Sequence, residues 1–330
     1  ITRAPVELRK TAAQLIRERM DEVPADLAAH NELRFVSLNE IEAALQASVA
    51  SGEPVSDEIR YLHGLQRIDY LLVYPERQDI VLAGPGEAWT VSPFGDVVGA
   101  TSSMPVMLLD DLLVALRSTE AARTVGLSCS IDPTPDGRQS LNQFLARQKR
   151  FHPKVTKGVE KALGPQQISI TGIPVDSHFA GVLVAADFQM KRYAMGLEPA
   201  PIDGLPSFLE MIKKTGRASN NMMPRWWMGC DYASLGKTAD GLGWQLRGRG
   251  VKVMTEDDLV NADGSTTGSG QVNPVAQAWA TRMTDRFEDL AKVESVFGQV
   301  RNLMELSIVA ALIDREDLQA VAGCSLATMT

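Results

Sequence analysis

The segment from Pro174 to Trp227 constrains the fold of this chain most. It contains the most apolar helical stretch, which Asp176 or Ser177 is placed to cap and Gly196 is placed to end. A helix that is apolar on most sides has to be covered by other elements, so we expect it to lie inside a core. With 330 residues, the chain is long enough to build such a core without disulfides or metals.

The rest of the chain mixes helices with short strands. Apolar runs at 68–74, 80–83 and 89–91 are separated by turn residues, which is typical of an antiparallel meander. The low-complexity run 262–271 predicts a mobile loop. Because helical and strand patterns follow one another without strict βαβ alternation, we predict an α+β fold. Its sheet is expected to be mixed and largely antiparallel, with packed helices and a helical N-terminal segment before it.

The patterns divide the chain into three parts. Residues 1–64 are predicted as the helical N-terminal segment, in which Ser37 stands three residues before Glu40 in capping-box spacing. Residues 65–320 are predicted as the α+β core domain. Residues 321–330 show no clear pattern and are predicted as a C-terminal tail that frays.

Charge and motif spacing argue against several classes of protein. The formal net charge of −8 gives no reason to expect nucleic acid as a partner. No apolar run approaches the roughly 18 to 20 residues of a transmembrane segment. The three cysteines and four histidines lack the spacing of a metal site, and Gly236-Lys237-Thr238 lacks the earlier glycine of a phosphate loop. We therefore predict no metal and no cofactor.

No local motif for catalysis is present. If the chain is an enzyme, His178 or Asp187 is the residue expected to act as a base, because both lie on the central helix. Arg192 or Arg225 would then hold an anionic group. We favour a structural role for both residues. His178 is then a capping or core residue, and Asp187 pairs with Lys191 four residues later in the helix.

The dipeptide Trp226-Trp227 behind Arg225 is the strongest interaction feature. In a strand the two tryptophans point to opposite faces, so one is expected in the core while the other is exposed. An exposed tryptophan beside arginine is typical of interface anchors and of platforms for sugars or bases. Lys191 and Arg192 are the further binding candidates, lining a cleft or contacting a neighbouring chain.

Several segments are distinctive rather than generic. They are GLQRIDYLLVYPERQDIVLAGPGEAW (64–89), SCSIDPTPDG (128–137), FAGVLVAADFQMKRYAMGLEP (179–199), MPRWW (223–227), GVKVMTED (250–257) and the helix beginning NPVAQAWA. Together they resemble an uncharacterised bacterial family, a domain of unknown function found mainly in planctomycetes. The resemblance covers roughly residues 37 to 314 and implies an exported protein, while it implies no catalytic residues. Export would also account for a chain that begins at Ile1 rather than Met, as would a shortened form.

We therefore expect an exported protein of the cell envelope, periplasmic or extracellular, that works by self-association or by binding a partner. The expected partners are a second copy of the chain or other envelope proteins. A hydrolase-like enzyme with a cleft near the 177–196 helix is the alternative. A carbohydrate-binding module that uses Trp226 or Trp227 is a further alternative.

Overall fold

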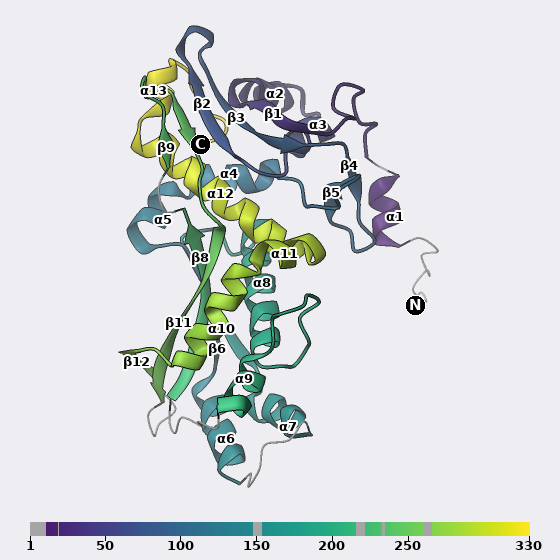
Figure 1. The fold of residues 1–330 in the computed structure, drawn as a ribbon. Coiled ribbons are helices and arrows are strands. Elements are labelled where there is room, and N and C mark those ends of the chain that lie inside the picture. The colour runs from purple at the N-terminus through teal and green to yellow at the C-terminus, as the bar shows by residue number, and fades with distance from the viewer. Residues whose placement is uncertain (1–10, 19, 148–153, 216–221, 233–234, 261–265) are drawn as a thin grey trace, which may run out of the picture. The chain divides into compact units, whose positions relative to one another are not determined.

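A computed structural model describes residues 11–18, 20–147, 154–215, 222–232, 235–260 and 266–330 (Figure 1). The chain divides into two compact units made of interleaved segments. Unit 1 comprises residues 1–119, 233–247 and 301–330, and unit 2 comprises residues 120–232 and 248–300. Helices and antiparallel sheets occur in both units, so the predicted α+β class is confirmed.

Unit 1 is organised around a five-stranded antiparallel sheet in the order β1-β3-β2-β10-β9. Its strands are β1 (Asn31–Ser37), β2 (Tyr70–Tyr74), β3 (Asp79–Gly86), β9 (Gly236–Lys237) and β10 (Gly243–Gln245). The register aligns one buried row across four of them, formed by Val36, Leu82, Leu71 and Trp244. This alternation of buried and less buried positions is what the period of two in a strand requires.

Short helices and a second, two-stranded sheet complete unit 1. The elements are α1 (Ala12–Arg17), α2 (Leu38–Ser51), α3 (Asp57–Arg60), η1 (Leu62–Gly64), η2 (Pro75–Arg77), β4 (Trp89–Val91), β5 (Val97–Gly99), α4 (Leu109–Arg117) and α13 (Leu318–Ala322). A separate buried cluster of Leu27, Tyr61, Trp89 and Val106 lies among them.

Helix α2 begins where the spacing of Ser37 and Glu40 predicted. The hydroxyl oxygen of Ser37 accepts a hydrogen bond from the backbone N–H of Glu40 at 3.0 Å, which satisfies one of the free amides of the first turn. Gly52 ends the helix with a φ of 74°, a conformation that glycine adopts without steric cost. Strand β1, directly before the cap, was not predicted, because its sequence is charged and only short runs of it are apolar.

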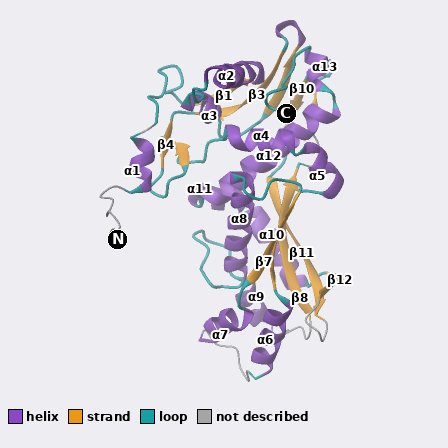
Figure 2. Cartoon of the chain, turned by 180° about the vertical axis from the view of Figure 1, so that it is seen from behind, coloured by secondary structure: helices purple, strands orange, loops and turns teal. Residues whose placement is uncertain are grey.

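Unit 2 contains a three-stranded antiparallel sheet in the order β12-β11-β8 and a two-stranded sheet of β6 and β7 (Figure 2). The strands are β6 (Ser128–Pro133), β7 (Gln166–Thr171), β8 (Met222–Asp231), β11 (Gly250–Val260) and β12 (Thr266–Gln271). The helices are α5 (Thr119–Val125), α6 (Pro135–Ala146), α7 (Lys154–Leu163), α8 (His178–Ala194), α9 (Phe208–Thr215), α10 (Pro274–Asp285) and α11 (Phe287–Val293).

The central helix and the helix after Asn273 are confirmed. In α8, Ser177 rather than Asp176 is the cap, since its hydroxyl accepts from the backbone N–H of Ala180 at 3.1 Å. After Asn273 the apolar side chains of the helices are buried, at Ala276, Trp279, Met283, Phe287 and Leu290. The mobile loop predicted for 262–271 is wrong for 266–271, which form β12 against β11; residues 261–265 lie outside the described residues.

Helix α12 (Ser295–Arg315) is the longest helix that the structure describes, and the boundary between the units falls within it. By length and composition it is apolar enough to cross a membrane, yet 72% of its apolar window is buried in the structure. A core helix passes the same test. Its polar residues have partners: Glu305 Oε1 accepts from Arg67 Nε at 3.1 Å, and Glu305 Oε2 accepts from the backbone N–H of Ile68 at 2.7 Å.

The last ten residues are packed, in contrast to the expected fraying. Leu326 and Met329 are fully buried. The carboxylate of Glu42 accepts hydrogen bonds from the backbone N–H groups of Thr328 and Met329, at 2.9 and 3.1 Å. Arg117 Nε donates to the carbonyl oxygen of Met329 at 3.0 Å. These partners come from α2 and α4, so no local pattern in the last ten residues could reveal them.

Replacing Glu305 by alanine should destabilise unit 1 by about 3 to 4 kcal/mol, because the change removes the buried carboxylate that pairs with Arg67 and accepts from the Ile68 amide. Burial raises the pKa of Glu305, while Arg67 and Arg301 oppose that shift. Urea unfolding followed by circular dichroism measures the loss. Glu76→Ala, at an exposed position of the same unit, is the control and should leave the midpoint unchanged.

The stability that Glu42 contributes by binding the C-terminal residues should depend on pH. Burial alone would raise the pKa of Glu42, but hydrogen bonds from Thr328, Gln46 and Met329 outweigh it and lower the pKa below 4.5. The stability that the carboxylate contributes is therefore present above pH 4.5 and is lost as the pH falls through the lower folded value. Glu42→Gln should cost about 1 to 2 kcal/mol at pH 7. An equal difference from wild type at pH 7 and pH 3 would contradict this.

Candidate functional site

Asp187 on α8 is held in an ion pair rather than presented to a ligand. It is 5% exposed, and its Oδ2 lies 2.7 Å from Lys191 Nζ. Lys191 also donates to the carbonyl oxygen of Ile131 on β6 at 3.1 Å. Burial raises the pKa of Asp187, and the charge and hydrogen bond of Lys191 oppose that shift. The pair therefore fastens α8 to β6.

The other residues predicted near the central helix do not converge with Asp187. His178 is exposed in the first turn, nine residues before Asp187, which separates the two by roughly 13 Å along the helix axis. Arg192 pairs with Glu198 at 3.1 Å and lies over the ring of Phe188 at 5.5 Å. The predicted bases and anion-binding residues of α8 thus do not form one catalytic constellation.

The cysteines do not offer a nucleophile either. All three are free, and burial raises the pKa of Cys129 and of Cys230 to about 11. Both thiols are therefore protonated at neutral pH, which removes the reactive thiolate. Among the described residues, no group of three or more histidine, cysteine, aspartate or glutamate side chains is arranged to hold a metal ion.

The two tryptophans of β8 point to opposite faces, as the alternation of a strand predicts. Trp226 is 5% exposed and packs edge-on against Phe208 and Trp279, at 5.0 and 5.4 Å between ring centroids. Trp227 is half-buried, and the guanidinium of Arg225 lies 5.3 Å from its ring centroid. Arg225 also pairs with Glu256 on β11 at 3.1 Å. Trp226 is thus a core residue, whereas Trp227 lies half-buried on the opposite face of the strand.

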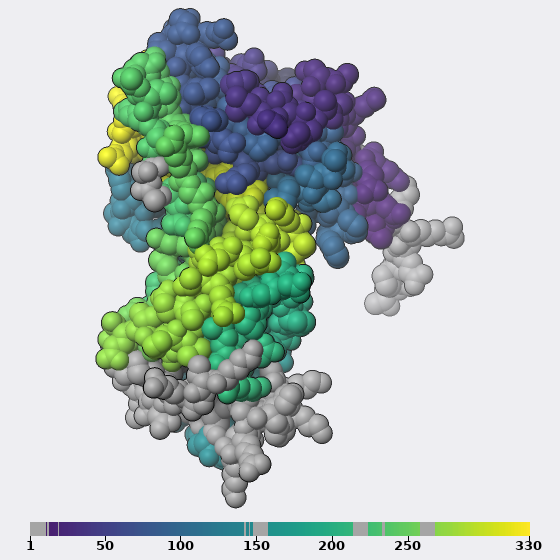
Figure 3. Space-filling model, in the orientation of Figure 1, coloured from purple at the N-terminus to yellow at the C-terminus, as the bar shows by residue number. Residues whose placement is uncertain are grey.

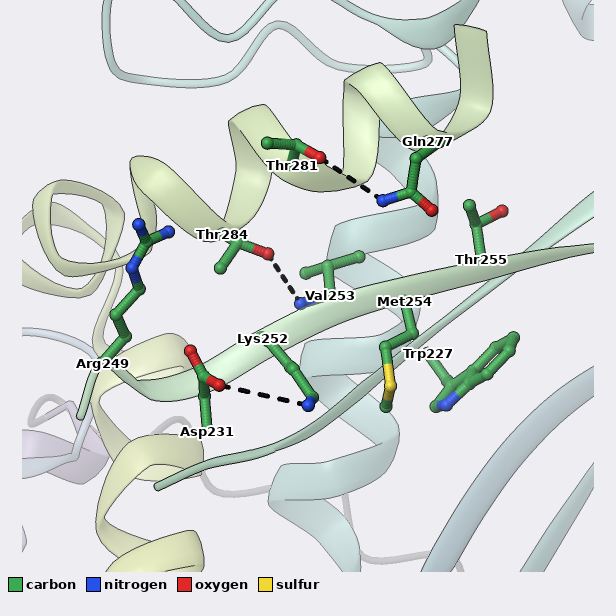
Figure 4. Close-up of a pocket in the computed structure, with 10 residues that line it drawn as sticks. All are labelled: Trp227, Asp231, Arg249, Lys252, Val253, Met254, Thr255, Gln277, Thr281 and Thr284. Carbon is green, nitrogen blue, oxygen red and sulfur yellow. Dashed lines mark hydrogen bonds and ion pairs between the residues drawn. The ribbon is translucent and has the colours of Figure 1, made fainter. Parts of the chain in front are cut away.

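Trp227 lies at an open groove between the β8–β11 pair and helix α10, with a volume of about 440 Å³ (Figure 4). One wall is a row of polar side chains on α10, Gln277, Thr281 and Thr284, spaced by four and three residues so that they share a helix face. This segment of α10 lies at the surface in the view of Figure 3, in yellow-green. The strands contribute the other lining residues, which are Trp227, Asp231, Arg249, Lys252, Val253, Met254 and Thr255.

Hydrogen bonds fix the α10 wall against β11. Thr284 Oγ1 accepts from the backbone N–H of Val253 at 2.9 Å, and it donates to the carbonyl oxygen of Ala280 in its own helix. Gln277 Nε2 donates to Thr281 Oγ1 at 3.3 Å. Because Val253 N–H points away from β8, α10 closes the edge of β11 that β12 leaves uncovered.

Ion pairs bring opposite charges together at this groove. Lys252 Nζ lies 4.0 Å from Asp231 Oδ1, and Arg249 forms a close pair with Asp285. Arg225 and Trp227 were predicted from the sequence as binding candidates, whereas Lys252, Thr255 and the α10 row were not. The spacing of Gln277, Thr281 and Thr284 in the sequence already places them on one face of a helix. Their position against β11, however, depends on long-range packing, which no local pattern reveals.

The ion pair between Asp187 and Lys191 should stabilise the fold. Lys191→Met leaves the buried carboxylate of Asp187 without its cation, so we expect a loss of about 2 to 3 kcal/mol, less than for a fully buried pair because Lys191 is partly exposed. The double variant Asp187→Leu, Lys191→Met should recover most of it, as an apolar pair needs no charge compensation. Thermal unfolding measures both. No recovery in the double variant would contradict a purely structural role.

A family model matches part of the chain. Residues 129–208 match the model of a family described as a protein of unknown function (DUF1598). The match begins in β6, includes α6, α7, β7 and α8, and ends at the start of α9. Neither a curated protein nor a solved structure matches the chain.

Proposed function

We propose that the protein is an exported, non-catalytic protein of the cell envelope that associates with a second copy of itself through strand β7. The observation that carries the self-association is the exposure of this strand. Five of its six residues are exposed, among them Ile168 at 52%, and Ile170 is half-buried. A two-stranded sheet is marginal alone, and an exposed edge strand is a template for a further strand.

The backbone groups of β7 support this use. The carbonyl oxygen of Ile131 on β6 accepts from Lys191 Nζ, and Pro133, two residues later, has no N–H to donate to β7. We infer from both that these residues turn their backbone groups away from β7. Ile168 is the residue directly opposite Ile131. In an antiparallel pair both opposed residues turn their backbone groups toward each other or both away, so Ile168 presents its N–H and C=O to the free edge. Gln166 and Ile170, two residues to either side, do the same.

The strand is complementary to itself. An antiparallel β7–β7 pair with its two-fold axis at Ile168 sets Gln166 of one copy opposite Ile170 of the other. The sequence Gln166–Thr171 carries no charge and no proline, so no repulsion or missing donor interrupts this pairing. The product is a four-stranded sheet in the order β6-β7-β7-β6.

Three other sheet edges in the described structure are less suited to addition of a strand. Strand β1 has a register shift between Asn31 and Arg34 and carries Glu32 beside it. Strand β9 has only two residues, and β8 contains Pro224. Bulges, charges, short length and proline are the usual means by which proteins block edge pairing. The β7 edge has none of them.

The N-terminal helix is a weaker candidate for the interface. Its described part, α1, packs on its own unit, since Arg17 Nη2 donates to the carbonyl oxygen of Val91 at 2.6 Å and Ala13 is buried. Residues 1–10 lie outside the described residues. Export rests on the resemblance of the distinctive segments to a family whose members look exported.

Ile168→Pro should convert the self-associated protein into a monomer. Proline at this position removes the outward N–H while the hydrogen bonds between β6 and β7 stay intact. Light scattering over a concentration series measures the mass. Ile168→Val keeps the donor and is the matched control, so it should associate as the wild type does.

Two results would overturn the proposal. A wild-type protein that is monomeric at every concentration excludes self-association. An oligomer that Ile168→Pro leaves intact, with the circular dichroism of the folded protein, moves the interface elsewhere.

A further inference from the structure

The turn Leu62–Gly64 in unit 1 has a strained backbone. Leu62 and His63 have φ angles of 44° and 56°, in the left-handed region that residues with a side chain rarely adopt, and Gly64 follows with 73°. The backbone N–H of Gly64 donates to the carbonyl oxygen of Tyr61 at 2.8 Å and closes the turn. Strain of this kind persists only where the surrounding structure enforces it, so the turn opens when that support weakens.

The guanidinium of Arg34 on β1 supports this turn. Arg34 is 5% exposed, and its Nη1 donates to the carbonyl oxygens of His63 and Glu87 at 2.6 and 3.2 Å. Its Nη2 donates to the carbonyl oxygens of Leu27 and Ala29 at 3.1 and 2.8 Å. One buried cation therefore joins the strained turn to the segment before β1, so that a change in the turn also affects this segment.

The segment before β1 covers a small apolar cluster. Leu27 lies in this cluster with Tyr61 and Trp89, and Trp89 is only 4% exposed. The start of the segment is attached separately, because Asp21 and Asp57 exchange hydrogen bonds between backbone N–H and carboxylate at 2.9 and 3.0 Å. If Leu27 leaves the cluster, Trp89 becomes exposed while the chain before it stays attached.

The imidazole of His63 lies where a positive charge is unfavourable. The side chain is 13% exposed, and its Nε2 is buried without a hydrogen-bond partner among the described residues. A protonated imidazole carries a hydrogen on both nitrogens, so Nε2 would become a buried donor without an acceptor. The carboxylate oxygen Oε1 of Glu58 lies 3.9 Å from Nε2, beyond hydrogen-bonding distance.

The charged groups around His63 do not remove this cost. Burial lowers the pKa of His63 below 6.5, and the charge of Arg34 acts in the same direction. Three carboxylates oppose the shift only in part, and they belong to Glu58 on α3, Glu40 on α2 and Asp26 before β1. The neutral imidazole is therefore the form that fits the closed turn.

We propose that the turn is a pH-sensitive switch: protonation of His63 opens it, loosens its bond to Arg34 and releases the segment around Leu27. The open turn exposes the imidazole to water, where it binds a proton more readily, so acid favours the open state. The closed state is most stable above pH 6.5 and loses stability as the pH falls from 6.5 toward the lower pKa of His63 in the folded protein. This inference does not depend on self-association, since it uses no residue of β7.

Hydrogen–deuterium exchange of the full chain tests the switch, read by mass spectrometry on peptides that cover residues 22–34. Intrinsic exchange depends on pH, so wild type is compared with His63→Asn at the same pH. Asparagine does not titrate, and it adopts the left-handed region more readily than most residues. The ratio of the wild-type to the variant exchange rate should rise at least about three-fold between pH 7.0 and pH 5.0. The amide of Leu27, which donates to the carbonyl oxygen of Pro24 at 2.9 Å, is among those that lose protection.

Two further variants complete the comparison. His63→Gly is a second variant that does not titrate, and glycine adopts the left-handed region without steric cost, so it should give the same rise in the ratio as His63→Asn. His178→Asn, at an exposed histidine of unit 2, is the matched control and should exchange as wild type does at both pH values. Titration of the His63 ring, followed by NMR, should give a folded-state pKa below 6.5.

Either of two results would overturn the inference. The first is a ratio of exchange rates that stays constant between pH 7.0 and pH 5.0 for both His63 variants, because any opening in acid would then come from other groups. The second is a folded-state pKa of His63 at or above 6.5, because protonation would then not favour the open turn.

Discussion

The buried carboxylate of Glu305 is the interaction on which unit 1 depends most. Helix α12 is apolar enough by composition to cross a membrane, yet Arg301, Asn302 and Glu305 are all buried in it. Glu305 bonds to Arg67 and the Ile68 amide, and Asn302 Nδ2 donates to the carbonyl oxygen of Pro105 at 3.1 Å. A shift of the helix by one residue would leave these polar groups buried without partners. The free-energy cost of burying these groups unpaired, rather than the strength of the hydrogen bonds, therefore fixes the register of α12 against the segment before β2.

The same principle, applied across the molecule, separates structural from functional polar groups. Asp187 and Lys191 satisfy each other, and the carboxylate of Glu42 satisfies the amides of the C-terminal residues. In these clusters each polar group meets its partner, and the clusters hold the fold together. The outward backbone groups of β7 are different, because no hydrogen bond among the described residues joins them to another element. Incomplete polar groups of this kind, not sequence motifs, direct attention to a partner.

Much of the fold follows from local sequence signals. Ser177 and Gly196 bound α8 as their cap preferences predict, and Trp226 and Trp227 divide between core and surface by the alternation of a strand. Strand β12 escaped prediction because its glycines and serines carry no strand pattern, and its pairing with β11 overrides its low propensity. The groove escaped because α10 and β8 are about fifty residues apart, and only tertiary packing brings Gln277 and Trp227 to one surface.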